Sequence, residues 1–143
     1  MMNPQIYISA DETTFHLTNG EFSYILHCLP DGHLMHLWSG KAVRPEADYT
    51  CFHEVFPRPM TSCPDADSWY SREHTAQECG TFGSSDFRTP AIEITHPDGS
   101  TLSDFQLTSW NILDGKPALP GLPAVYCEDS SEAKTLECIL TDQ

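Results

Sequence analysis

Residues 77–100 have the sequence QECGTFGSSDFRTPAIEITHPDGS, a glycine-punctuated loop followed by an Asp-Phe-Arg triplet, a short alternating stretch and a turn. Gly83 permits backbone angles that other residues resist. Asp86 and Arg88 are two residues apart, so on an extended chain their side chains leave one face while Phe87 enters the other. We predict that Arg88 is buried and that its ion pair ties the loop to a sheet, because such pairs are more often structural than catalytic.

Alternating stretches on both sides of this loop predict β-hairpins. Asn19-Gly20 is a signal for a type I′ turn, in which both central residues have positive φ. No stretch shows a sustained helical period, so the sequence predicts an all-β fold, an antiparallel β-sandwich. The predicted strands are residues 5–9, 13–18, 21–28, 33–38, 91–95, 102–110 and 134–140.

Between residues 42 and 76 the alternation fails, and four prolines interrupt any strand ladder. We predict one long irregular loop there. Flat apolar rings beside planar polar groups are typical of sugar-binding sites. The alternative is that the rings pack on the loop's own sandwich or on another subunit. The residues concerned are Tyr49, Phe52, Phe56, Trp69 and Tyr70, with Glu54, Arg58, Asp65 and Asp67 as hydrogen-bonding partners.

The composition limits the size and the partners of the protein. A length of 143 residues fits a single domain, 1–143. Seven basic residues against 21 acidic ones give a net charge of −14, which disfavours nucleic acid and anionic membranes as partners and favours a neutral ligand. The sequence has no apolar run long enough for a membrane span and no signal-peptide pattern at its start, so we expect a cytoplasmic protein.

Six cysteines in a chain without an export signal are expected to be free thiols. A metal site is the alternative, but the spacing of the available ligands does not fit known zinc sites, and no metal or cofactor is predicted. We expect His33 and His36 to be surface or hairpin histidines. The ligands considered for the metal site are Cys51, His53, Cys63 and Cys79.

Several short blocks follow one another along the chain. They are Gly83-x-x-Asp86-Phe87-Arg88-x-Pro90-Ala91, Asp98-Gly99-Ser100, Gly115-Lys116-Pro117 and Gly121-Leu122-Pro123-Ala124-x-Tyr126, with Leu37-x-x-Gly40-Lys41 and Arg58-Pro59 among the flanking matches. In their order and spacing these blocks resemble the amino-terminal region of the glycoside hydrolase family 36 α-galactosidases. The resemblance covers nearly the whole chain.

The resemblance implies a galactose mutarotase-like supersandwich, of which this chain is the first part. In that family the sandwich precedes a (β/α)₈ barrel that carries the two catalytic carboxylates of a retaining hydrolase. No catalytic residue is therefore expected in this chain. The intact enzyme would hydrolyse terminal α-galactosides such as melibiose or raffinose. It would be a homo-oligomer in which the loop around Glu54, Phe56 and Arg58 reaches a neighbouring subunit's sugar site.

Three hypotheses follow. The first is a non-catalytic domain that serves subunit assembly and shapes the entrance to the sugar site. The second is an autonomous carbohydrate-binding module, and the third a mutarotase-like enzyme that uses a histidine and a carboxylate for proton transfer. If the sandwich is incomplete, its unpaired strand edges should make the protein self-associate.

Overall fold

The computed structural model describes residues 4–55, 70–83, 85–121, 125 and 127–143. Its strands are β1 (Gln5–Ile8), β2 (Thr14–Thr18), β3 (Phe22–Cys28), β4 (Leu34–Lys41), β5 (Phe105–Asp114) and β6 (Lys134–Asp142), and its short 3₁₀ helices are η1 (Thr50–Phe52) and η2 (Ser130–Glu132). Strands β1 to β4 form an antiparallel sheet in sequence order, and β5 pairs with β6. The predicted all-β antiparallel fold is confirmed. No helix among the described residues is long and apolar enough to cross a membrane.

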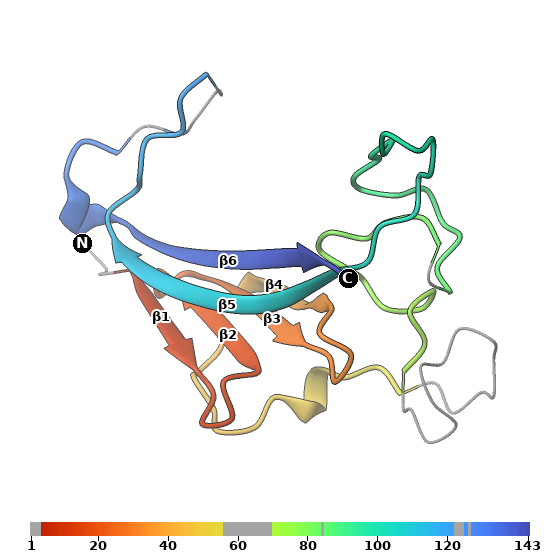
Figure 1. Ribbon diagram of the computed structural model, residues 1–143. Helices are drawn as coiled ribbons and strands as arrows, with labels where there is room; N and C mark the ends of the chain where they lie inside the picture. The colour runs from red at the N-terminus through yellow and green to blue at the C-terminus, as the bar shows by residue number, and fades with distance from the viewer. Residues whose placement is uncertain (1–3, 56–69, 84, 122–124, 126) are drawn as a thin grey trace.

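The β5–β6 hairpin lies across one face of the four-stranded sheet (Figure 1). Phe15 of β2 is fully buried and meets Trp110 of β5 edge-on, with 5.7 Å between ring centroids. Leu26 is opposite Phe15 on β3 and therefore projects from the same face. A hydrogen bond of 2.8 Å from the Leu107 N–H to the Gly32 carbonyl joins the two layers.

The other face of the sheet is covered by residues 42–54. His16 and Ile25 are paired across β2 and β3, so they project from this second face, and both are fully buried. Trp38 of β4 contacts Phe52 of η1 there, with ring centroids 5.7 Å apart. Because both faces of the sheet are covered, its strands bury residues on both sides.

Strand β4 carries a β-bulge. Ile25 is opposite Trp38, but the next residue of β3, Leu26, is opposite His36, which leaves Leu37 as the extra residue. The outer edge of β4 is partly paired, since the His36 N–H donates to the Ala76 carbonyl at 2.7 Å. Residues 76–78 thus cover this edge and bring the end of the irregular loop back to the sheet.

The strand predicted at residues 91–95 is wrong, because the structure has no strand there. Ile92 and Ile94 are exposed, so their alternation finds no sheet to pack on. The turn that follows is present: the Gly99 N–H donates to the His96 carbonyl at 2.9 Å, and Gly99 has a φ of 85°.

The type I′ turn predicted at Asn19-Gly20 is also wrong. Thr18 pairs with Ser23, which places Gly20 and Glu21 at the centre of the turn, and only Gly20 has a positive φ, of 87°. Glycine at the first central position is typical of a type II′ turn. Asn19 stays outside the centre, where its side-chain oxygen accepts a hydrogen bond of 2.8 Å from the Phe22 N–H.

Candidate functional site

The segment 42–54 is fixed to the sheet by a buried histidine. His16 Nδ1 is 2.9 Å from the Tyr49 hydroxyl, and its Nε2 is 2.8 Å from the Ser23 hydroxyl. Ser23 also accepts a hydrogen bond of 3.1 Å from the Val43 N–H. Burial lowers the pKa of His16, so the ring is neutral at neutral pH and both of its nitrogens are used.

A second histidine contact holds the far end of the same segment. The rings of His27 and His53 are 4.6 Å apart, and His27 Nδ1 lies 2.8 Å from the Thr14 hydroxyl. Burial and then the proximity of His53 lower the pKa of His27 to about 4, although the charge of Asp11 acts in the opposite direction. Between them, His16 and His27 determine where η1 and the residues that follow it lie on the sheet.

Helix η1 forms locally because an aspartate precedes it. The Asp48 carboxylate accepts a hydrogen bond of 2.8 Å from the Thr50 N–H and another from the Thr50 hydroxyl at 3.0 Å. Such a local bond favours a turn. His53 then returns to an extended conformation and leads to Glu54.

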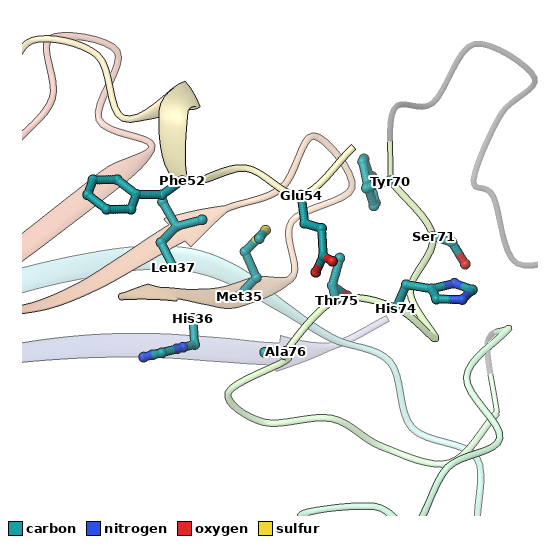
Figure 2. A pocket seen from close by; sticks show the side chains of 10 residues that line it. All are labelled: Met35, His36, Leu37, Phe52, Glu54, Tyr70, Ser71, His74, Thr75 and Ala76. Carbon is teal, nitrogen blue, oxygen red and sulfur yellow. The ribbon is translucent and has the colours of Figure 1, made fainter. Parts of the chain in front are cut away.

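Glu54 lines a cavity of about 210 Å³ at the bulged end of β4. Figure 2 shows its side chain directed from the 42–54 segment toward the segment that carries Thr75. The cavity is smaller than the roughly 300 Å³ at the lower limit for typical small-molecule pockets. Its wall mixes rings with polar groups: Met35, His36, Leu37, Phe52, Glu54, Tyr70, Ser71, His74, Thr75 and Ala76.

One wall of this cavity is held by a largely buried ion cluster, which we call the Arg72 cluster: Asp31, His33, Arg72 and Asp104. Arg72 Nε is 2.9 Å from Asp31 Oδ2, and its Nη1 is 3.1 Å from Asp104 Oδ1. His33 Nε2 is 2.9 Å from the same Asp104 oxygen. The cluster joins the β3–β4 turn, the 70–76 segment and the start of β5, so it fixes the cavity wall to both sheets.

The ionisation of the cluster follows from its contacts. Burial alone would raise the pKa of Asp31, but the contacts with His33 and Arg72 lower it to about 2. Burial likewise opposes charge on His33, yet the neighbouring Asp31 raises the pKa of His33. His33 Nδ1 lies 3.2 Å from Asp31 Oδ1 without hydrogen-bond alignment, so we regard that contact as Coulombic. The expectation that His33 is a surface or hairpin histidine is half wrong: it follows a hairpin turn, but it is buried.

The predicted ion pair of Asp86 and Arg88 is present, and we call it the Arg88 pair. Arg88 Nη2 is 2.6 Å from Asp86 Oδ2 and also donates to the carbonyls of Arg72 and Thr75, at 2.8 and 2.9 Å. The predicted burial of Arg88 is wrong, since its side chain is 45% exposed, and Phe87 does not enter an interior. The pair nevertheless holds the same 72–75 segment that the Arg72 cluster holds from the other side.

Of the residues singled out in the predicted loop, Tyr49, Phe52, Glu54 and Tyr70 can be placed, whereas Asp65, Asp67 and Trp69 lie outside the described residues. Phe56 and Arg58 lie outside the described residues, and so does Cys63 among the metal ligands considered. In the described part of the chain, no group of three or more His, Cys, Asp or Glu residues is arranged to hold a metal ion. The five described cysteines are free thiols.

Sequence reasoning missed the Arg72 cluster and the β4 wall of the cavity. The signal for the cluster was weak, because Arg72 lies in an aperiodic stretch and its partners are 41 and 32 residues away. Asp31-Gly32 is a turn signal in the sequence and does not by itself indicate an ion pair. Basic residues are few in this acidic chain, so each arginine was a candidate to neutralise buried carboxylates.

Comparisons with known proteins agree on one family. The family model described as the glycosyl hydrolase family 36 N-terminal domain matches residues 32–143. The α-galactosidase AgaA of Geobacillus stearothermophilus is 39% identical over 129 residues, which is 90% of this chain and 18% of AgaA. The crystal structure of AgaB from the same organism superposes with a TM-score of 0.81 at 35% identity, over 96% of this chain and 18% of AgaB.

A further solved structure shows what such a relative binds. The A355E D548N variant of AgaA in complex with raffinose matches with a TM-score of 0.78 at 37% identity, over 90% of this chain and 18% of that one. The chain therefore spans about a fifth of the length of the relatives that it matches. The similarity concerns the fold of this stretch.

Proposed function

The chain belongs to the glycosyl hydrolase family 36 N-terminal domain family, and we propose that it is the non-catalytic amino-terminal β-sandwich of an α-galactosidase. One observation carries the proposal: the family match extends over residues 32–143, while the alignment with AgaA covers only 18% of the length of AgaA. The catalytic carboxylates of the intact enzyme would lie in a downstream (β/α)₈ barrel. Its substrates would be terminal α-galactosides, the class to which the raffinose bound by an AgaA variant belongs.

The domain's own contribution would be to assemble subunits and to shape the entrance to the sugar site. Residues 42–54 support this role, because two histidine contacts fix them on the sheet and Glu54 lines the cavity beside β4. A carboxylate accepts hydrogen bonds from sugar hydroxyls, and an adjacent ring such as Phe52 suits a sugar's apolar face. In a homo-oligomer, Glu54 would face a galactoside held mainly by a neighbouring subunit.

A chimera tests the proposal. The stretch of AgaA that matches this chain is replaced by the chain itself, and hydrolysis of an aryl α-galactoside and of raffinose is measured. We expect the chimera to hydrolyse both and the isolated chain to hydrolyse neither. Hydrolysis by the isolated chain at a rate that follows its concentration would overturn the proposal, and so would a folded chimera without activity.

Glu54→Ala in the active chimera tests the role at the entrance. We expect KM to rise more than kcat falls, the result of losing uniform binding at the edge of a site. Glu128→Ala is the matched control, since Glu128 is an exposed carboxylate elsewhere in the described chain. Equal kcat and KM values for the two variants would show that Glu54 does not contribute to the sugar site.

The cavity also supports a second candidate, an autonomous carbohydrate-binding module. Its wall holds two rings, Phe52 and Tyr70, next to Glu54 and His74. Calorimetric titration of the isolated chain with galactose and raffinose separates the candidates. Binding that Glu54→Ala abolishes would favour the module, and faster galactose mutarotation in the same samples would favour a mutarotase-like enzyme. We expect neither.

A further inference from the structure

The connection between residues 80 and 104 exposes several large apolar side chains. We call four of them the lobe surface: Phe82, Phe87, Ile92 and Leu102, which are 39–69% exposed. In Figure 1 this connection extends beyond the end of both sheets as a separate lobe. Single exposed apolar residues are ordinary, but a group of them on one element marks an interaction site.

The four side chains form one patch. Phe82 and Phe87 meet edge-on with ring centroids 5.6 Å apart. Leu102 lies directly over Gly83, where a Cβ atom would be only 2.4 Å from Leu102 Cδ2. Phe82 and Ile92 line the same hollow, of about 280 Å³. Aromatic side chains grouped in this way are the residues that dominate protein interfaces.

The patch is presented by a braced loop. Asp86, which precedes Phe87, donates its N–H to the Gly83 carbonyl at 2.8 Å and accepts from the Gly83 N–H at the same distance. The Arg88 pair holds the residue after Phe87. The Thr81 hydroxyl donates to the Ser103 carbonyl at 2.5 Å, which joins the two ends of the lobe. Phe87 is therefore held outward by bonds on both sides, a preorganised arrangement that reduces the entropy cost of binding.

The end of the matched stretch lies beside this lobe. The family match reaches Gln143, whose N–H donates to the Asp104 carbonyl at 3.2 Å. The preceding residue, Asp142, accepts a hydrogen bond of 2.7 Å from the Asp104 N–H. Figure 1 shows this end of the chain where β5 leaves the lobe. A polypeptide that continued from the matched stretch would therefore begin next to the lobe surface.

We propose that the lobe surface docks against the part of the α-galactosidase polypeptide that follows the matched stretch in the relatives. The proposal rests on the proposed function, because it takes its occupant from the enzyme to which the domain would belong. That occupant would present an apolar face to Phe82, Phe87, Ile92 and Leu102. A second copy of this chain is the competing occupant.

The test compares the chimera with the isolated chain. Phe87→Ser combined with Leu102→Ser should make protease cleavage at the junction of the chimera about tenfold faster, which corresponds to a loss of 1.4 kcal/mol in docking. The same pair of substitutions should leave the melting temperature of the isolated chain unchanged, because both side chains are exposed there. Phe22→Ser on β3 is the control, since Phe22 is 47% exposed and lies outside the lobe.

Each outcome is informative. Equal rates of cleavage at the junction in the wild-type and double-variant chimeras would overturn the proposal that the lobe surface is a docking surface. Self-association of the isolated chain that Phe87→Ser abolishes would identify a second copy as the occupant and overturn it as well. A folded but inactive wild-type chimera would reject the proposed function and leave the cleavage comparison measurable. A wild-type chimera that does not fold would count against both.

Discussion

Two arginines hold the same segment of this protein in different ways. Arg72 is 13% exposed and bridges Asp31 and Asp104, which belong to different layers of the sandwich. Arg88 is 45% exposed and pairs with Asp86, two residues before it. The local pair is visible in the sequence, and its arginine is exposed although Asp86 is buried. The cluster that joins the layers leaves almost no trace in the sequence. Ease of recognition and structural importance are thus separate properties of an ion pair.

The energetics of the two sites should differ accordingly. Loss of one partner from a buried pair leaves the other charge in a medium of low dielectric constant. In the Arg88 pair the carboxylate is buried but the arginine is exposed, so water screens this pair more strongly and its loss should cost less. Asp86 also keeps other donors, since Gln77 Nε2 is 2.8 Å and the Arg88 N–H 3.1 Å from its carboxylate.

The largest effect is expected for Arg72→Met, which keeps the volume of the side chain and removes its charge. Asp31 and Asp104 then lose the guanidinium between them, and we expect the free energy of unfolding to fall by about 3–5 kcal/mol. Chemical denaturation measures the change. A loss no larger than that of Arg88→Ala would break the contrast between the two sites.

Acid should weaken the Arg72 cluster. The pKa of Asp31 is lowered to about 2 from an ordinary value of 3.8. A lowered pKa in the folded state stabilises the protein above the ordinary value, and this contribution is lost as the pH falls toward the folded value. The difference in unfolding free energy between wild type and Arg72→Met should therefore shrink as the pH falls from about 4 to about 2. A difference that stays constant across this range would contradict the assignment.

Arg88→Ala should have the smallest effect. We expect a loss of about 1 kcal/mol, because Arg88 itself is 45% exposed and the buried Asp86 keeps hydrogen bonds from Gln77 and from the N–H of residue 88. Thermal unfolding followed by circular dichroism measures it, with Arg88→Lys as a control that keeps the charge but not the planar fork. An unchanged melting temperature would show that the Arg88 pair does not brace the lobe.

The sequence allowed a good prediction of residues 5–41 and a poor one of residues 70–104. In the first region each strand pairs with the next, so local alternation and turn residues contain most of the information. Residues 91–95 alternate equally well but have no neighbouring strand, and tertiary context overrode their propensity. Glu54 was expected near a site from its neighbours in the loop. The wall opposite, at His36 and Leu37, depends on a bulge and on edge pairing that no local pattern indicates.

The sequential order of β1 to β4 has a consequence for how the protein folds. Contacts between neighbours along the chain close short loops, so the four-stranded sheet can form early, whereas the Arg72 cluster must bring residues 31, 72 and 104 together. We therefore expect the cluster to be absent from the folding transition state. Arg72→Met would then speed unfolding and leave the folding rate nearly unchanged, and a chevron plot in which the folding limb slows instead would show that the cluster is part of the nucleus.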